Sequence, residues 1–204
     1  MSPSLGPDSE AAIINAPPTP VLILPGIGDS GPGHWQSIWQ AANPNFHRVA
    51  QQDWDHPKCA DWVQALEQAV AQFGSRSVLV AHSLGCLLVA HWALVTRHRI
   101  QGALLVAPPD TEAAVFPSAA ATFSPAPLEP LPFPNIIFAS SNDPYASISY
   151  SETLATAWGS QLVNIGAAGH INAASGFGEW DDGFLMLQKF MRRNTLHQQP
   201  VHKT

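Results

Sequence analysis

The chain has 204 residues, of which 46% are hydrophobic and only 12% are charged, and its formal net charge is −6. Such a length is typical of one domain, and the apolar fraction is enough for a sizeable core. The acidic balance argues against nucleic-acid binding and against docking on anionic lipid, because both need clustered Lys and Arg. The composition therefore favours a globular domain with neither a nucleic-acid nor a membrane partner.

The sequence shows no pattern that would place the chain in a membrane or a secretory route. No apolar run approaches the ~18–20 residues of a membrane span. We expect no signal peptide, because the N-terminus lacks a basic start followed by an apolar stretch. The two cysteines, Cys59 and Cys86, form no C-x-x-C pair and are too few for a disulfide framework. Reduced thiols are typical of the cytoplasm, which is the expected location.

Apolar runs and amphipathic segments alternate along the chain. We expect one ordered domain over residues 20–193, between flexible tails over residues 1–19 and 194–204. Mainly apolar runs predict strands at Val21–Leu24, Ser77–Ala81, Gly102–Ala107, Asn135–Ala139 and Leu162–Ile165, and Arg48–Gln51 has a weaker strand pattern. Helical spacing predicts helices at Ala60–Phe73, Gly85–Thr96, Ser147–Trp158 and Asp182–Arg192. The alternation indicates right-handed crossovers and a mainly parallel sheet, so the predicted fold is three-layer α/β.

One segment interrupts this alternation. Pro108–Pro134 contains eight prolines, a density that is incompatible with a regular helix or a central strand. Long irregular loops within a domain are often functional. We therefore expect this segment to form a lid or a wall of a substrate site.

The segment Val78–Leu88 carries the most specific chemical signal. It places Ser83 at a sharp turn from a buried strand into a helix. A nucleophile at such an elbow needs small residues two positions before and two positions after it, and Ala81 and Gly85 meet this need. A helix N-terminus also favours a developing anion. The pattern predicts Ser83 as a nucleophile.

A serine nucleophile requires a base, and the base requires an acid that orients it. Asp143 follows the fifth predicted strand and His170 follows the sixth, so both lie at the carboxyl edge of the sheet, where open α/β folds bind ligands. We expect His170 to be the base and Asp143 the acid. Asp110, which follows the fourth strand, is the alternative acid.

The loop after the first strand is rich in glycine, which lets a backbone approach a substrate closely. An oxyanion hole would combine the N–H of Leu84, just after the nucleophile, with an N–H from this loop. Ile27 is the first choice for the second donor, and Gly28 is the reserve.

Taken together, these motifs resemble the small serine hydrolases of the α/β-hydrolase superfamily, in particular the branch of retinoblastoma-binding protein 9 and the YdeN-like proteins. The motifs are Pro25–Gly28 with His34 and Trp35, His82–Gly85, Ser141–Pro144 and Gly169–Trp180. The resemblance implies a short six-stranded sheet in the order 2-1-3-4-5-6, with helices on both faces and no large cap domain. It also implies a triad of Ser83, Asp143 and His170. Retinoblastoma binding is not implied, because the L-x-C-x-E motif is missing.

We therefore expect a serine hydrolase that cleaves a small carboxylic ester, thioester or amide through an acyl-enzyme on Ser83, with aminopeptidase-type activity also open. Gly28, His34 and Trp35 are expected to border the substrate. We expect no cofactor and no metal, because no pair of histidines has the spacing of metal ligands. The alternatives are an acyltransferase and a protein-interaction module on a hydrolase scaffold, the latter suggested by Pro108–Pro134.

Overall fold

Six parallel strands form one sheet in the order β2-β1-β3-β4-β5-β6. The computed structural model describes residues 18–197. The strands are β1 (Val21–Leu24), β2 (Phe46–Arg48), β3 (Val78–His82), β4 (Gly102–Val106), β5 (Asn135–Ala139) and β6 (Gln161–Asn164). The strand order and the parallel sheet that the sequence predicted are confirmed.

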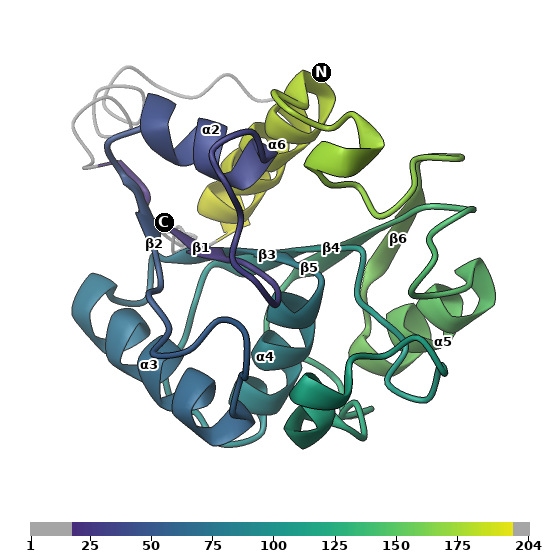
Figure 1. Cartoon of the computed structure of the whole chain (residues 1–204). Coiled ribbons are helices and arrows are strands. Elements are labelled where there is room, and N and C mark those ends of the chain that lie inside the picture. The colour runs from purple at the N-terminus through teal and green to yellow at the C-terminus, as the bar shows by residue number, and fades with distance from the viewer. Residues whose placement is uncertain (1–17, 198–204) are drawn as a thin grey trace, which may run out of the picture.

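Helices cover both faces of this sheet (Figure 1). They are α2 (Trp35–Ala42), α3 (Cys59–Phe73), α4 (Leu84–Ala93), α5 (Ile148–Trp158) and α6 (Asp181–His197), with short 3-10 helices η1 (Ser118–Phe123) and η2 (Ala173–Ser175). Helices α2 and α6 lie on one face, and α3, α4 and α5 lie on the other. Within residues 18–197, no helix is both long and apolar enough to cross a bilayer.

Strand β1 shows how the buried sheet divides the core in two. Its side chains alternate between the faces, as the period of two in a strand requires. Val21 and Ile23 pack into the cluster that includes Trp35 under α2. Leu22 and Leu24 pack into the cluster on the α3 and α4 side. Because both faces are covered, the strand is apolar at every position, which is why a continuous run predicted it.

Two differences from the predicted elements lie next to β1. Helix α2 was not predicted; it begins after the cap residue His34 and buries Trp35 and Trp39. Strand β2 covers Phe46–Arg48, earlier than the predicted Arg48–Gln51. A three-residue edge strand offers too short a pattern for its bounds to be assigned from sequence.

The last helix is longer than expected. Helix α6 continues through His197, and the buried Asn194 donates from its side chain to the Gln101 carbonyl at 3.3 Å. The expected C-terminal tail over residues 194–204 is therefore corrected at its start, because residues 194–197 continue α6 and Asn194 is bonded to the residue before β4. Residues 198–204 and residues 1–17 of the expected N-terminal tail lie outside the described residues.

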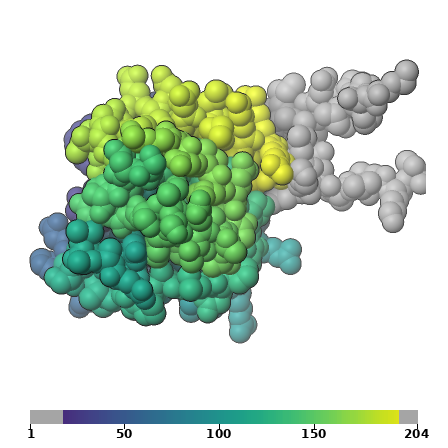
Figure 2. Space-filling model, turned by 90° about the vertical axis from the view of Figure 1, so that its right-hand side faces the viewer, coloured from purple at the N-terminus to yellow at the C-terminus, as the bar shows by residue number. Residues whose placement is uncertain are grey.

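The proline-rich segment packs closely against the domain. Its helix η1 contacts α3 and α4, and it buries Ala120 and Phe123 completely. Figure 2 shows a face of the molecule with α6 (yellow) at the top, the region around α5 (green) in the middle and earlier, teal-coloured residues at the bottom. No separate cap domain rises above the sheet among the described residues.

Candidate active site

Ser83 occupies a strained turn between β3 and α4. Its φ of 55° and ψ of −123° are rarely adopted by a residue with a side chain, and such strain persists only where neighbours hold it in place. The neighbours leave no room for larger residues. A Cβ on Gly85 would lie 2.3 Å from the Leu24 carbonyl oxygen, and a Cβ on Gly26 would lie 2.9 Å from the Ser83 Cβ. The turn thus presents the Ser83 hydroxyl at the end of β3.

Ser83, His170 and Asp143 form one hydrogen-bonded chain. The Ser83 Oγ lies 2.9 Å from His170 Nε2, and His170 Nδ1 lies 2.9 Å from both carboxylate oxygens of Asp143. A carboxylate only accepts, so Nδ1 carries the proton and Nε2 accepts from the serine hydroxyl. The side chains of His170 and Asp143 are 8% and 3% exposed, so the chain is shielded from solvent.

The carboxylate that contacts His170 belongs to Asp143 and not to the alternative, Asp110. Asp143 also accepts the backbone N–H of Tyr145 at 2.9 Å, which orients the carboxylate further. Asp110 instead accepts the backbone N–H of Glu112 at 2.9 Å in its own turn. The structure thus brings together the three residues that the sequence singled out first.

Two polar side chains join the loops that carry Asp143 and His170, and sequence reasoning gave neither of them a role. Ser140 accepts the N–H of Ala168 at 2.9 Å and donates to Asn142 at 2.9 Å. Asn142 in turn accepts the N–H of Gly169 at 2.7 Å. These bonds fix the loop after β5 to the loop after β6, and so set the position of the carboxylate relative to the imidazole. The only sequence feature that indicated these bonds was the presence of Ser140 and Asn142 shortly before Asp143.

His82, which precedes Ser83, is hydrogen-bonded to the backbone of His170. Its Nε2 lies 2.9 Å from the His170 carbonyl oxygen, which can only accept, so Nε2 carries the proton. Burial, and then the nearby His170 and His34, hold the pKa of His82 well below its usual value. His82 is therefore a neutral donor that fixes the backbone of His170.

Two backbone N–H groups near Ser83 are available for a developing oxyanion. Leu84 is the first residue of α4, so its N–H has no partner within the helix. Neither this N–H nor that of Ile27 is hydrogen-bonded to another residue within 18–197. The N–H of Gly28, by contrast, donates to the Trp54 carbonyl at 2.8 Å. Gly28 is therefore corrected as the reserve donor.

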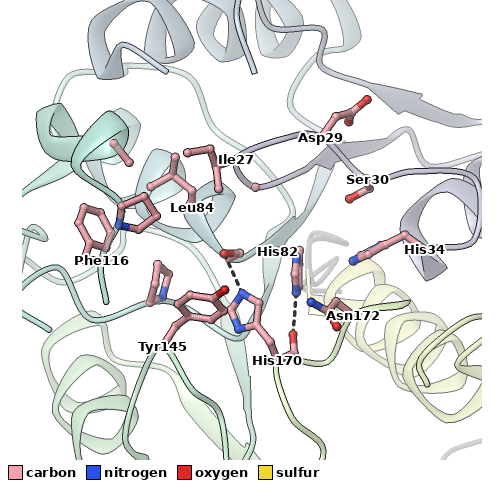
Figure 3. Close-up of a pocket in the computed structure, with 15 residues that line it drawn as sticks. Ile27, Asp29, Ser30, His34, His82, Leu84, Phe116, Tyr145, His170 and Asn172 are labelled. Atoms are coloured by element: carbon pink, nitrogen blue, oxygen red, sulfur yellow. Dashed lines mark hydrogen bonds between the residues drawn. The ribbon is translucent and has the colours of Figure 1, made fainter. Parts of the chain in front are cut away.

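A cavity of about 200 Å³ opens above Ser83 and has two unlike sides (Figure 3). Its lining includes Ile27, Leu84, Phe116, Pro117 and Tyr145 on the apolar side, and Asp29, Ser30, His34 and Asn172 on the polar side. The expected role of the proline-rich segment as a wall matches the place of Phe116 and Pro117. The structure thus assigns this segment to the rim of the site.

Of the three residues that were expected to border substrate, only His34 lines this cavity. Trp35 is completely buried and donates from its indole to the Ile171 carbonyl at 2.9 Å. It follows His34 directly, but on a helix adjacent side chains point in different directions, so it faces the core. Gly28 is exposed and is not among the lining residues, and its N–H is bonded to the Trp54 carbonyl. The expectation is corrected for Trp35 and for Gly28.

Arg48 and Gln36 hold the loop between β1 and α2, and sequence reasoning missed both. Arg48 pairs with Asp29 and donates to the Ser30 carbonyl at 3.1 Å and to Ser37 at 2.7 Å. Gln36 is fully buried, and its amide nitrogen donates to the carbonyl of Leu24 at the end of β1 at 3.1 Å and to that of Val80 within β3 at 3.0 Å. Its oxygen accepts from Ser30 at 2.7 Å. The polar side of the cavity is therefore anchored to the sheet.

The remaining nucleophilic side chain near Ser83 is structural. Cys86 is fully buried and its Sγ lies 3.3 Å from the Val106 carbonyl oxygen. Burial raises the pKa of the Cys86 thiol, which keeps it in the unreactive protonated form. No group of three His, Cys, Asp or Glu side chains within the described part of the chain is arranged to hold a metal ion.

Comparison with known families agrees with this geometry. The family model described as "Serine hydrolase" matches residues 21–189, which is most of the chain. The chain belongs to the serine hydrolase family. The resemblance that the motifs indicated is thereby confirmed, and the family supports the coarse function of an enzyme that hydrolyses its substrate.

Solved structures with the same fold include YdeN-like proteins. A protein from Pectobacterium atrosepticum that is described as a YdeN-like hydrolase is 33% identical, with a TM-score of 0.77, over 86% of this chain and 91% of that one. The ydeN gene product of B. subtilis is 20% identical, with a TM-score of 0.70, over 86% and 100%. Esterase 2 of Thermogutta terrifontis is 15% identical, with a TM-score of 0.60, over 86% and 83%. The last two show likeness of fold alone. A search of curated proteins found no significant match.

Proposed function

We propose that this protein cleaves a small carboxylic ester, thioester or amide through an acyl-enzyme on Ser83. The observation that carries the proposal is the unbroken chain from the Ser83 hydroxyl through His170 to the Asp143 carboxylate, with both bonds at 2.9 Å. A serine becomes a nucleophile when an adjacent base can take its proton and a third group orients that base. Ser83 and His170 line a cavity of a size for a small substrate, and Asp143 contacts His170 outside that lining.

The first step would form the acyl-enzyme. Ser83 Oγ attacks the substrate carbonyl carbon while its proton passes to His170 Nε2, and the carbonyl oxygen becomes an oxyanion. The N–H groups of Leu84 and Ile27 are the proposed donors to this oxyanion, and the N-terminus of α4 adds a favourable dipole. Asp143 stabilises the imidazolium that forms. The carbon–leaving-group bond then breaks, and the leaving group takes the proton from Nε2.

The second step would release the acid. His170, again neutral, takes a proton from a water molecule, and the resulting hydroxide attacks the acyl carbon. Collapse of this second tetrahedral intermediate returns the proton to Ser83 Oγ and frees the carboxylic acid. These steps use only groups of the chain and water, and we propose no cofactor.

The composition of the cavity supports an uncharged substrate. Its apolar side is formed by carbon-rich side chains such as Phe116 and Leu84, and the carboxylate of Asp29 is paired with Arg48. The feature that suggested an interaction module, the proline-rich segment, forms a wall of this cavity, so we favour hydrolysis over that alternative. Both cysteines are free thiols, and we propose a cytoplasmic location on that ground.

Hydrolysis of p-nitrophenyl esters of short acids tests this proposal. We expect turnover by the wild type and loss of turnover in Ser83→Ala, which removes one hydroxyl and leaves the turn intact. Ser141→Ala is a matched control, because Ser141 is exposed and lies outside the cavity lining. Equal turnover in Ser83→Ala and the wild type would refute the assignment of the nucleophile. Product analysis with a competing alcohol separates hydrolysis from acyl transfer.

A further inference from the structure

The polar side of the cavity contains a buried hydrogen-bonding atom that the described chain leaves unpaired. His34 is only 6% exposed, yet its Nε2 has no hydrogen-bond partner within residues 18–197. Buried polar atoms in folded proteins are almost always paired. Because His34 lines the cavity, its partner can come from a molecule that enters there.

The capping role of His34 fixes which ring nitrogen carries the proton. His34 is the N-cap of α2, and its Nδ1 lies 3.2 Å from the backbone N–H of Gln36. This N–H can only donate, so Nδ1 must be the acceptor, and the single proton of a neutral imidazole is then on Nε2. Burial, and then the positive charge of Arg48, lower the pKa of His34 to about 4, so the ring stays neutral at physiological pH. His34 therefore offers a neutral N–H donor.

Asn172 supplies a second donor by the same logic. Its Oδ1 accepts the backbone N–H of Ser175 at 3.0 Å and the Ser175 hydroxyl at 2.9 Å, so this oxygen caps η2. Asn172 is half-buried, and its amide nitrogen makes no hydrogen bond to another described residue. Figure 3 shows Asn172 and His34 on one side of His170, with Phe116 and Leu84 on the other.

The charges on this side compensate one another. The Asp29 carboxylate pairs with Arg48, whose guanidinium also donates to Ser30 and Ser37. A substrate ammonium therefore meets a carboxylate that is already neutralised, and a substrate carboxylate meets a guanidinium that is already engaged. His34 and Asn172 are neutral donors, and the nearby Asp29 and Arg48 are already paired with each other. This side of the cavity therefore suits an uncharged hydrogen-bond acceptor of the substrate.

This pair of donors lies close to the reacting atoms. The rings of His34 and His82 have centroids 4.8 Å apart, and those of His82 and His170 are 4.9 Å apart. His34 is thus separated from the proposed base by one ring. A substituent a few bonds from the scissile carbonyl could span that separation.

We propose that His34 and Asn172 bind an uncharged oxygen of the substrate, such as an ether or carbonyl oxygen, a few bonds from the scissile carbonyl. An apolar group of the substrate then lies against Phe116 and Leu84 on the opposite side. The inference rests on the proposed hydrolysis at Ser83 and specifies its substrate class, which is a small ester or amide with one apolar end and one oxygen-bearing end.

Two isosteric substrate pairs test the inference. The first pair places the oxygen in the acyl group: p-nitrophenyl methoxyacetate against p-nitrophenyl butanoate. The second pair places it in the alcohol: 2-methoxyethyl butanoate against butyl butanoate. Within each pair one ether oxygen replaces one methylene group. The quantity compared is the ratio of kcat/KM for the ether to kcat/KM for its methylene counterpart, so intrinsic differences in reactivity cancel between protein variants.

The variants remove each donor and retain its cap. Asparagine is also a good N-cap, so His34→Asn can still cap α2 but is too short to place an N–H where Nε2 lies. Asn172→Asp keeps the oxygen that caps η2 and replaces the amide nitrogen with oxygen. His56→Asn, at a side chain that is 80% exposed and outside the cavity lining, is the matched control.

In one of the two pairs, we expect the ether-to-methylene ratio to fall about fivefold to tenfold in His34→Asn and in Asn172→Asp, the effect of losing one hydrogen bond. The ratio should not change in His56→Asn. An unchanged ratio in both pairs, in variants that a fluorophosphonate probe still labels, would overturn the inference. Wild-type protein that is labelled but hydrolyses neither pair would overturn it too and leave the nucleophile in place. Absence of labelling would instead remove the proposed function.

A spectroscopic measurement tests the donor itself without turnover. Nitrogen NMR of the histidine rings at pH 7 should show His34 as the neutral tautomer with its proton on Nε2. A proton on Nδ1, or an imidazolium, would contradict the assignment of His34 as a neutral donor to the cavity.

Discussion

His82 donates from Nε2 to the backbone carbonyl of His170 at 2.9 Å, so the residue before the proposed nucleophile fixes the residue proposed as its base. The bond joins the end of β3 to the loop after β6, which are 88 positions apart in sequence. Serine and imidazole are therefore positioned relative to each other by more than their own contact. A small displacement of the imidazole from Ser83 would slow the reaction, because proton transfer needs hydrogen-bonding distance.

This relationship predicts that His82 acts as a positioning residue. His82→Leu removes the donor, and we expect kcat to fall about tenfold or more while KM changes little, because the base is displaced and the cavity is retained. His82→Gln can still present an N–H to the carbonyl and should retain most of the activity. Steady-state kinetics of both variants provide the measurement. Equal loss in the two variants would show that the imidazole matters for packing and not as a donor.

The acid is predicted to be Asp143 and not Asp110. In Asp143→Asn the carboxylate that accepts from His170 is lost, and we expect kcat to fall about 10³–10⁴-fold, the usual effect of disturbing the tautomer of a triad histidine. Asp110→Asn is the matched control, because Asp110 caps its own turn, and we expect it to keep near wild-type activity. Loss of activity in Asp110→Asn with survival of Asp143→Asn would reverse the assignment.

The close packing around the turn at Ser83 predicts different effects of substituting two glycines by alanine. Gly85→Ala would place a methyl group 2.3 Å from the Leu24 carbonyl oxygen, so β1 and α4 must separate. We expect the free energy of unfolding to fall by about 1–3 kcal/mol or more, with loss of activity. Gly31→Ala meets no atom within 4 Å and should change stability by less than about 0.5 kcal/mol. Urea denaturation measures both, and equal stability of the two variants would contradict the described packing.

The buried histidines predict a dependence of stability on pH. The pKa of His34 is lowered to about 4 and that of His82 lies well below its usual value, so the folded protein keeps both neutral. The unfolded chain binds these protons below about pH 6.5, so it takes up more protons than the folded state, and stability falls as pH decreases from about 6.5 towards 4.

The size of this effect is set by the pKa difference. Each such histidine lowers the free energy of unfolding by up to about 1.4 kcal/mol per pH unit in that window. Denaturation midpoints at pH 7 and pH 5 give the slope, which should be smaller in His34→Asn than in His56→Asn. An identical slope in those two variants would contradict a buried neutral His34.

The sheet and the turn at Ser83 could be predicted because their signals are local. A strand that is buried on both faces is apolar throughout, and Ala81 and Gly85 flank Ser83 within five residues. The strand that precedes Ser83 and the helix that follows it also lie next to it in the chain. Strand β2, with its three residues at the sheet edge, was misplaced because its local pattern is weak, and helix α2 was missed.

The surroundings of the triad could not be predicted, because they depend on contacts between distant segments. Asp143 and Asp110 both follow a strand end, and the contact of Asp143 with His170 distinguishes them, which depends on the bonds of Ser140 and Asn142 to the loop after β6. Similarly, Arg48 reaches the loop before α2 only because β2 pairs with β1. His34 and Trp35 are adjacent in sequence, yet one lines the cavity and the other lies in the core, a distinction that requires the position of α2.

Covalent labelling with a fluorophosphonate probe, read by intact mass, tests the central claim most directly, because it reports an activated serine without a guess at the substrate. The account predicts one adduct per chain in the wild type and none in Ser83→Ala, with peptide mapping to Ser83. A folded wild-type protein that takes up no label, or an adduct that persists in Ser83→Ala, would contradict the claim that Ser83, His170 and Asp143 form a working triad.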